Sequence, residues 1–328
     1  MGNWNTEHLL EKIQTYIGKL SAVREPKGLY DPIVYILSLG GKRLRPMLML
    51  QAYNLYKDDV DSILSQAVAI ETYHNFTLLH DDLMDQADVR RNKPTVHKMW
   101  NMNTAILSGD AMLIESYHYM MQNCPSEYVQ QVMSTFSEAA LEVCEGQQYD
   151  MDFEKRMDVT VNEYIEMIRL KTSVLLAAAL KIGAILGGAS SEDIQALYDF
   201  GIKMGLAFQL QDDYLDVYGD SSFFGKKIGG DILCNKKTYM LITTLEKVKG
   251  TELEQELHYW LSLEYFVPKE KVDSVTSIYN KVGIADICRK KIDEYYTEGL
   301  RLLDKIQADS VRKEQLKSYV CGLVNRKL

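Results

Sequence analysis

Three aspartates stand at the end of a stretch with helical apolar spacing, at Asp81, Asp82 and Asp85. Residues four apart share one face of a helix, so Asp81 and Asp85 are expected to be neighbours, with roughly 5–6 Å between their Cβ atoms. Two carboxylates that close repel each other and resist desolvation unless a cation lies between them. Mg²⁺ suits such a pair, because it binds one or two carboxylates and completes its octahedron with water and phosphate oxygens.

Two arginines follow this acidic group, at Arg90 and Arg91. A guanidinium offers a planar fork of donors that matches the geometry of a phosphate group. Together, the acidic group and the arginine pair indicate a site for a metal ion and a phosphate. A solvated acidic helix end followed by a basic turn would contain the same residues, so this group alone does not decide between the two.

A second copy of the acidic pattern follows about half a chain later, at Asp212, Asp213 and Asp216, again at the end of a helical apolar run. Four separate basic clusters accompany the two copies, at residues 42–45, 90–93, 226–227 and 236–237. The first of them, GGKRLRP, could be a surface turn if taken alone, although its glycines would let the backbone approach an anion closely. The conjunction favours one cavity that binds a diphosphate-rich ligand.

The composition is that of an ordinary globular protein, with 328 residues of which 46% are hydrophobic and 25% charged. The net charge of −9 argues against a nucleic-acid partner, which would require a basic face. The five cysteines are scattered and lack any C-x-x-C spacing, which indicates reduced thiols and a cytoplasmic location.

No segment predicts a membrane span or a signal peptide. The first 14 residues contain no apolar run. The most apolar stretch, residues 174–189, is short for a bilayer and contains Lys181, so we expect a buried helix there.

Helical periodicity runs through nearly the whole chain and predicts an all-α fold. Length alone would allow two domains, but no linker divides the chain, so we expect a single domain over residues 1–328. Capping residues predict helix starts at Thr160, with Glu163, and at Ser190, with Asp193. Further helices are expected from Thr6, before residue 39, over residues 60–85 and 107–121, and in three or four segments after residue 251.

The motifs, in their order, resemble those of the trans-isoprenyl diphosphate synthase (polyprenyl synthetase) family. GGKRLRP, LLHDDLMDQADVRRNKPTVH, GQQYDMD, KTS, GLAFQLQDDYLD and GKKIGGDILCNKKT carry the resemblance, which extends from about residue 35 to the C-terminus. It implies a bundle of roughly a dozen helices around a deep central cavity, usually in a homodimer. One departure from the family pattern is Asn92, where a glycine is frequent after the arginine pair.

The resemblance also implies roles for individual residues. It implies Mg²⁺, as a group of three ions per active site, held by Asp81, Asp85 and Asp212 and supported by Asp82 and Asp216. The allylic diphosphate would be bound by Arg90, Lys171, Gln209, Lys226 and Lys236, and isopentenyl diphosphate by Lys42, Arg45, His74 and Arg91, with Thr172 near the reacting carbons. Without the resemblance, His74 would be interpreted as a core histidine.

The implied reaction is a head-to-tail condensation. The allylic C–O bond ionises, the alkene of isopentenyl diphosphate attacks the cation, and a proton is lost; Lys171 and Thr172 join the aspartates as catalytic candidates. Cations that stabilise the departing pyrophosphate act where charge develops in the transition state. The alternatives are a longer-chain synthase and a non-catalytic subunit of a heteromeric prenyltransferase, although such subunits typically lack the aspartates that are intact here.

Three residues before the first acidic group are candidates for setting product length. One helical turn rises roughly 5.4 Å, comparable to an isoprene unit, so a bulky side chain at a given turn limits the growing chain. Phe76 and Tyr73 are bulky, whereas Thr77 is small. This combination resembles archaeal geranylgeranyl synthases and predicts a C20 product over C15. Phe76 could instead simply pack between helices.

Overall fold

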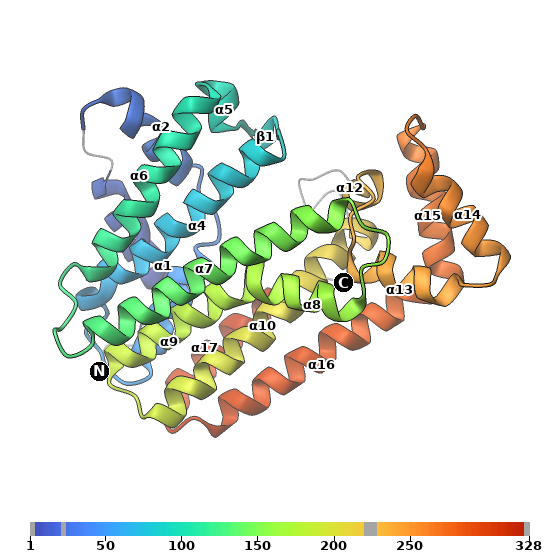
Figure 1. Ribbon diagram of the computed structural model, residues 1–328. Coiled ribbons are helices and arrows are strands. Elements are labelled where there is room, and N and C mark those ends of the chain that lie inside the picture. The colour runs from blue at the N-terminus through green and yellow to red at the C-terminus, as the bar shows by residue number, and fades with distance from the viewer. Residues whose placement is uncertain (1–3, 21–23, 220–227, 325–328) are drawn as a thin grey trace. The chain divides into compact units, whose positions relative to one another are not determined.

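Apolar residues at intervals of three and four are buried along most of the chain, and these stretches form helices (Figure 1). The computed structural model describes residues 4–20, 24–219 and 228–324. In the helix that begins at Thr6, the predicted stripe is buried at Leu9, Ile13 and Ile17 and partly buried at Leu10. The prediction of an all-α protein is confirmed, and the described residues contain one small sheet, of two short strands.

The chain forms two compact units. The first comprises Met1–Glu138, Ala178–Tyr198 and Ile306–Leu316, and the second comprises Ala139–Ala177, Asp199–Lys305 and Lys317–Leu328. Four helices contribute residues to both units: α7 (Val129–Glu154), α9 (Val174–Gly187), α10 (Ser191–Tyr218) and α17 (Ser310–Val324). The single domain over residues 1–328 stays a prediction.

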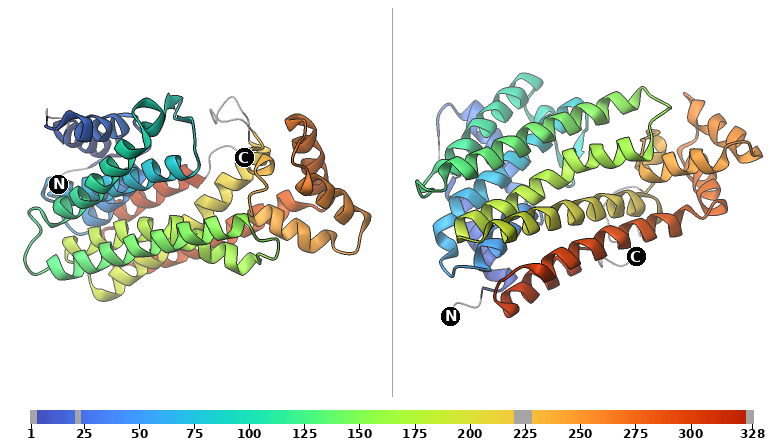
Figure 2. Two further views of the ribbon diagram at one scale, coloured as in Figure 1. Left: turned by 45° about the horizontal axis from the view of Figure 1, so that its top comes forward. Right: turned by 60° about the horizontal axis from the view of Figure 1, so that its bottom comes forward.

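The first unit is built around a long helix whose C-terminal end carries the first acidic group. Its elements are α1 (Thr6–Leu20), α2 (Lys27–Ser38), α3 (Leu44–Asn54), the 3-10 helix η1 (Val60–Ile63), α4 (Leu64–Met84), strands β1 (Val89–Arg90) and β2 (Lys93–Pro94), α5 (Val96–Met99) and α6 (Met102–Met121). Helices α4 and α6 pack side by side, and the β1–β2 hairpin follows the end of α4 (Figures 1 and 2).

The second unit carries the second acidic group at the end of α10. Its other elements are α8 (Val161–Ile168), the π-helix η2 (Arg169–Ser173), α12 (Gly230–Leu233), α13 (Tyr239–Val248), α14 (Glu252–Ser262), α15 (Pro268–Lys281) and α16 (Ile284–Lys305). Helices α14 and α15 form a hairpin that both views of Figure 2 show. A core cluster that includes Tyr214, Leu257 and Ile278 holds these helices together.

The predicted helix boundaries were accurate where capping chemistry is explicit. Thr160 accepts from the backbone N–H of Glu163, and Glu163 accepts from the backbone N–H of Thr160 at 2.8 Å, which confirms the capping box. The Ser190 hydroxyl accepts from the backbone N–H of Asp193 at 3.1 Å. The prediction was wrong at residue 107, because α6 begins five residues earlier, where Asn101 caps the helix through the N–H of Thr104.

The apolar stretch that was expected over residues 174–189 belongs to a longer helical run. The run Val161–Gly187 has 27 residues and is long and apolar enough to cross a membrane by length and composition. However, 83% of its most apolar window is buried inside the protein. That burial is typical of the core helix of a soluble protein, as we expected for this stretch.

Candidate active site

The three aspartates of the first acidic group have different surroundings. Asp82 is only 5% exposed, and its two carboxylate oxygens accept from Nε and Nη2 of Arg90 at 2.7 and 2.8 Å. Asp81 is partly buried, and Asp85, the residue that ends α4, is exposed. The middle aspartate therefore anchors the arginine, and the outer two are the more accessible carboxylates.

The arginine pair lies on a two-residue β-turn. Strands β1 and β2 pair antiparallel, with Arg90 opposite Lys93, so Arg91 and Asn92 form the loop. Both loop residues have positive φ, 52° and 61°, as the tight turns that suit a twisted hairpin require. Asparagine tolerates this conformation better than most residues, which explains how Asn92 replaces the glycine that is frequent in the family pattern.

Two further arginines of the first unit, Arg43 and Arg45, act electrostatically on His74 together with Arg90 and Arg91. Arg43 is 5% exposed and forms an ion pair of 2.7 Å with Glu71, which is 2% exposed. Arg45 lies on the first turn of α3, and its buried Nε has no hydrogen-bond partner. Burial lowers the pKa of Arg45 to about 10, and the charge of Glu71 opposes that shift. A buried cationic donor without a partner is a site for an anion.

The pKa of His74 reflects the local excess of positive charge. Burial lowers the pKa of His74 well below its ordinary value, and the charges of Arg45, Arg91, Arg90 and Arg43 lower it further. The imidazole is therefore neutral at pH 7, and the residue is a hydrogen-bonding group inside a cationic site. The charges of Arg45 and Arg91 thus act on His74, and the assignment of these three residues to one binding site stays a prediction.

Lys42 and the two glycines before it form the loop beside Arg91. Gly40 and Gly41 have positive φ, 80° and 126°. A Cβ atom built on Gly41 would lie 2.7 Å from Nη2 of Arg91, and Nη1 of Arg91 donates to the carbonyl of Gly40. Only glycine lets the guanidinium approach this closely. The Lys42 side chain is exposed at the edge of the group.

As in the first acidic group, the middle aspartate of the second group is buried and hydrogen-bonded to protein side chains. Its middle residue, Asp213, is 3% exposed and accepts from the Tyr164 hydroxyl and, at 3.0 Å, from Nε2 of Gln209. Burial raises the pKa of Asp213 and the charge of Asp231 adds to this, whereas Lys236 and the two hydrogen bonds favour the ionised form. Asp212 is partly buried.

The backbone at Gly229 and Asp231 is hydrogen-bonded to Asp216. Oδ2 of Asp216 accepts from the backbone N–H of Asp231 at 2.9 Å, and its carbonyl accepts from the N–H of Gly229. Lys236 lies close enough for its charge to act on Asp213. Lys226, the other lysine predicted for this loop, lies outside the described residues.

Lys171 and Thr172 lie on the π-helix η2. A Cβ atom built on Gly146 of α7 would lie 2.3 Å from the backbone nitrogen of Lys171, and one on Gly205 of α10 would lie 2.5 Å from Cα of Ser173. The two glycines therefore fix this irregular segment between α7 and α10. Lys171 donates to Asp150 at 2.7 Å, and π-helical turns occur frequently at functional sites.

The candidate residues for product length lie in a row of aromatic rings. Phe76 and Tyr73 have ring centroids 5.4 Å apart, and Tyr73 is 5.5 Å from Phe136 of α7. Phe76 also stands 4.8 Å from the ring of His80, the residue before the first aspartate. Thr77 donates its hydroxyl to the carbonyl of His74.

Sequence reasoning did not assign a role to four residues that form ion pairs or hydrogen bonds with the candidate site residues or their neighbours. Glu71, Asp150 and Tyr164 are the partners of predicted or neighbouring charges, and Arg43 was not separated from the basic cluster around it. Glu71 and Tyr164 each lie in an apolar helical run, where a polar residue that needs a partner is a signal that could have been used.

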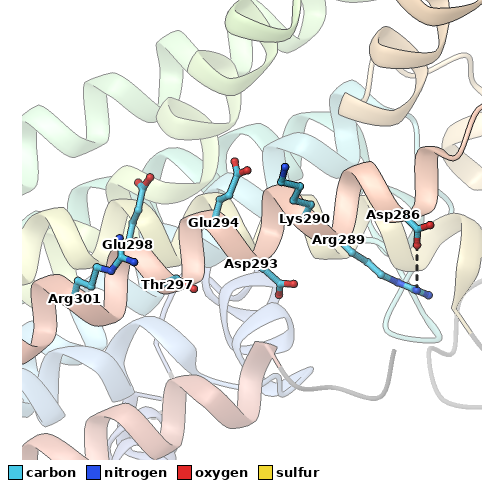
Figure 3. Close-up of a pocket in the computed structure, with 8 residues that line it drawn as sticks. All are labelled: Asp286, Arg289, Lys290, Asp293, Glu294, Thr297, Glu298 and Arg301. Atoms are coloured by element: carbon cyan, nitrogen blue, oxygen red, sulfur yellow. Dashed lines mark ion pairs between the residues drawn. The ribbon is translucent and has the colours of Figure 1, made fainter.

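A surface pocket in the second unit is separate from these groups. Its lining comes entirely from α16, between Asp286 and Arg301, and contains none of the predicted site residues (Figure 3). The lining contains acidic and basic side chains and one threonine, with an ion pair of 3.8 Å between Asp286 and Arg289. This is a solvated helix face.

Comparisons with known proteins agree with the resemblance that the motifs indicate. The polyprenyl synthetase family matches residues 26–282. A geranylgeranyl diphosphate synthase of Methanosarcina mazei is 38% identical over 297 residues, which is 90% of this chain and 89% of the relative. A geranylfarnesyl diphosphate synthase of Natronomonas pharaonis is 35% identical over 322 residues, 92% of each chain.

Solved structures agree as well. The crystal structure of a geranylgeranyl pyrophosphate synthase matches with a TM-score of 0.94 and 44% identity, and it covers 99% of this chain and 100% of that chain. The chain belongs to the polyprenyl synthetase family. It is an enzyme, a prenyltransferase.

The two neighbouring arginines Arg43 and Arg45 should respond differently to substitution. Arg43→Met leaves Glu71 buried without its partner and should lower the free energy of unfolding by about 3–5 kcal/mol. Arg45→Met removes an unpaired buried charge, so stability should change by less than about 1 kcal/mol, whereas affinity for inorganic pyrophosphate should fall about tenfold or more. Urea unfolding and calorimetric titration measure the two effects. Equal loss of stability in both variants would contradict this division.

Proposed function

We propose that the enzyme condenses isopentenyl diphosphate head to tail with an allylic diphosphate (dimethylallyl, geranyl or farnesyl) in a Mg²⁺-dependent reaction. The product would be a short all-trans prenyl diphosphate, C20 in preference to C15. The observation that carries the proposal is the cationic group around neutral His74, in which the buried Nε of Arg45 lacks a partner. The names of the relatives support the same reaction class.

The arginine group suits the diphosphate that does not ionise. Arg45 and Arg91 offer donors, and neutral His74 adds a hydrogen-bonding group without adding charge. Lys42 stands exposed at the rim, where it can approach the ligand as a mobile point charge. These four residues would hold isopentenyl diphosphate and direct its alkene toward the allylic carbon.

The donor set of the two acidic groups fits Mg²⁺. Within residues 4–20, 24–219 and 228–324, no three acidic, histidine or cysteine side chains converge as a closed metal site. The carboxylates of Asp81, Asp85 and Asp212, which are partly or fully exposed, suit Mg²⁺, because that ion uses one or two carboxylates together with water and substrate phosphates. We assign three ions to Asp81, Asp85 and Asp212, with Asp82 and Asp216 in support. When bound, the ions would neutralise charge on the leaving pyrophosphate.

The remaining polar residues would act on the allylic substrate. Its diphosphate would be bound by Arg90, Lys171, Gln209, Lys226 and Lys236, and Thr172 would lie near the reacting carbons. The allylic C–O bond breaks and its electron pair leaves with pyrophosphate. The alkene then supplies the pair for the new C–C bond, and the proton lost from the adduct goes to pyrophosphate as the base. No side chain has to act as a nucleophile.

Substitution of the outer aspartates tests the reaction. Asp81→Ala and Asp212→Ala should each reduce turnover by about 100-fold or more, because stabilisation of the charge that develops on the leaving group is lost. Purified protein would be incubated with Mg²⁺, isopentenyl diphosphate and each allylic primer, and the products would be sized. Circular dichroism would verify that the variants remain helical. Turnover near that of the wild type in either variant would falsify the proposed roles.

Product length would be limited by the aromatic row on α4. Phe76 is 9% exposed and Tyr73 1% exposed, and their rings are in contact one turn apart on the helix. The growing chain would extend past Phe76 toward Tyr73. Small Thr77, at the neighbouring position, would leave room for C20.

Removing the rings in turn should therefore lengthen the product. Phe76→Ala should shift the main product by one five-carbon unit, and Phe76→Ala with Tyr73→Ala should extend it further, because each helical turn rises roughly 5.4 Å. Reverse-phase separation of the dephosphorylated alcohols gives the distribution. Thr77→Phe is the opposite control and should shorten the product. An unchanged distribution in all three variants would move the limit to another helix.

A homodimer in the cytoplasm completes the proposal. Large apolar side chains are exposed along α6 at Met102, Ile106, Ile114 and Met121, with exposed fractions of 60%, 44%, 70% and 49%. Large apolar side chains exposed along one helix indicate a candidate interaction surface. A second copy of the chain would cover them. All five cysteines are free thiols, as suits a reducing compartment.

Charges placed on this stripe should separate the subunits. Ile106→Glu with Ile114→Glu should give a monomer, because burial of two carboxylates in an apolar interface is unfavourable. Sedimentation equilibrium measures the mass. Tyr265→Glu is a matched control, because Tyr265 is 90% exposed at the α14–α15 connection and lies outside the stripe. A doubly charged variant that still dimerises would place the subunit contact elsewhere. A monomeric wild type would contradict the proposed homodimer.

A further inference from the structure

One lysine of the second unit is fully buried near the start of α15. Lys271 is 0% exposed, although lysine is almost never fully buried unless its charge is paired. Its Nζ donates to the backbone carbonyl of Leu233 at 3.3 Å and lies 4.1 Å from the ring centroid of Phe266. A carbonyl dipole and the face of an aromatic ring each attract an ammonium group. The charge of Lys271 therefore meets α12 on one side and the α14–α15 connection on the other.

The place of Lys271 in its own helix does not favour a positive charge. Its backbone N–H donates to the carbonyl of Val267 at 3.2 Å and closes the first turn of α15. A cation so close to a helix N-terminus is unfavourable. Leu233, in contrast, is the last residue of α12, and the free carbonyls at a helix C-terminus attract cationic donors. The charge is thus unfavourable toward α15 and favourable toward α12.

Helix α12 carries the backbone donor that binds the last aspartate of the second acidic group. The N–H of Asp231 donates to Oδ2 of Asp216 at 2.9 Å, and the N–H of Gly229, the residue before α12, donates to the carbonyl of Asp216 at 2.6 Å. The helix has four residues, so a single turn separates these donors from the carbonyl that Lys271 binds. A displacement at the end of so short a helix also displaces its beginning.

A second contact of α15 fixes the beginning of α12. A Cβ atom built on Gly229 would lie 2.7 Å from Cγ2 of Val272, and Gly229 has a positive φ of 82°. Both the backbone conformation and the close approach require glycine here. Lys271 and Val272 are adjacent in α15, so one turn of that helix contacts both ends of α12.

We propose that Lys271 is a positioning residue for Asp216. By binding the last carbonyl of α12, it places the Asp231 N–H that orients the Asp216 carboxylate. The inference rests on the function proposed above, in which Asp216 supports the Mg²⁺ ions. When a backbone donor holds one carboxylate oxygen, the direction of the other oxygen is set before an ion binds, which is how residues behind a metal ligand raise its affinity. In this role Lys271 contacts neither the ion nor the substrate.

Lys271→Met tests this role, because methionine is similar in length and lacks the ammonium group. An apolar side chain in place of a buried charge is often neutral or stabilising, so the urea midpoint should stay at or above that of the wild type. The Mg²⁺ concentration for half-maximal turnover should rise about tenfold, as is usual when a residue that orients a metal ligand is lost. KM for isopentenyl diphosphate should change by less than about twofold, because the residues assigned to that substrate belong to the first unit. A lowered urea midpoint with an unchanged Mg²⁺ requirement would overturn the proposal, since a purely structural residue would give that result.

Hydrogen exchange of the metal-free protein gives a second readout, which does not depend on activity. In Lys271→Met the backbone amides of residues 229–231 should exchange about tenfold faster than in the wild type, because α12 is no longer held at its C-terminal end. The amides of α13 should exchange at the same rate in both proteins. Equal exchange at residues 229–231 would show that Lys271 does not position α12.

A double-mutant cycle shows whether the effect on Mg²⁺ passes through Asp216. In an Asp216→Ala background, Lys271→Met should change the half-maximal Mg²⁺ concentration by less than about twofold. A tenfold change that persists in this background would overturn the proposal. If Lys271→Met does not fold, Lys271→Gln, which is shorter and also uncharged, takes its place in all of these measurements.

The first unit offers a matched control in Lys57. Its Nζ donates to the carbonyl of Leu186 at 3.1 Å and lies 5.8 Å from the ring centroid of Tyr53, so Lys57→Met removes the same two kinds of contact outside both acidic groups. The Mg²⁺ requirement and the exchange of residues 229–231 should stay as in the wild type, and an equal change in this control would contradict the role of Lys271. A wild-type protein that forms no prenyl product removes the proposed function itself. An active wild type whose Mg²⁺ requirement Lys271→Met leaves unchanged removes only the role of Lys271.

Discussion

One buried carboxylate, that of Glu71, makes the cationic group of the first unit possible. Four guanidiniums whose charges all reach His74 would repel one another without buried counter-charges, which Glu71 and, beside Arg90, Asp82 supply. Glu71 pairs with Arg43 and also attracts Arg45 and Arg91, whose pKa values its charge raises against the effect of burial. Because Glu71 and Asp82 balance only part of the charge of the four arginines, the group remains positive before any ligand binds.

The two acidic groups follow the same division although they lie in different units. In each, the middle aspartate is buried and hydrogen-bonded to protein side chains, Asp82 to Arg90 and Asp213 to Tyr164 and Gln209. The first aspartate of each group is more exposed. A buried carboxylate with both oxygens satisfied contributes rigidity, whereas an accessible one retains lone pairs for a cation. The pattern D-D-x-x-D thus combines one buried, hydrogen-bonded carboxylate with carboxylates that are more accessible.

Sequence patterns gave the fold class and most of the charged candidates, because these depend on local spacing. The capping box at Thr160 and the helical periodicity before Asp81 are examples. The partner of each charged side chain could not be predicted from local spacing. Arg43 and Arg45 are two residues apart in one basic cluster, yet the Arg43 side chain is buried and paired with Glu71, which lies 28 residues away, whereas the Arg45 residue is only partly buried. Nothing local in the sequence distinguishes them, because long-range packing decides which side chain is enclosed.

The π-helix at Arg169–Ser173 has a consequence for how this chain can vary. A π-turn encloses one residue more than an α-turn, so the helix before it and the helix after it are out of phase by about the 100° that one residue spans. A one-residue deletion here would restore a regular α-helix and rotate the apolar surface of α9 away from its neighbours, or else rotate Lys171 and Thr172 away from Asp150 and Gln209. Substitutions are tolerated one side chain at a time, but a change of length at this segment alters two surfaces together. An insertion or deletion in this segment is therefore expected to disrupt the structure more than a substitution at the same place.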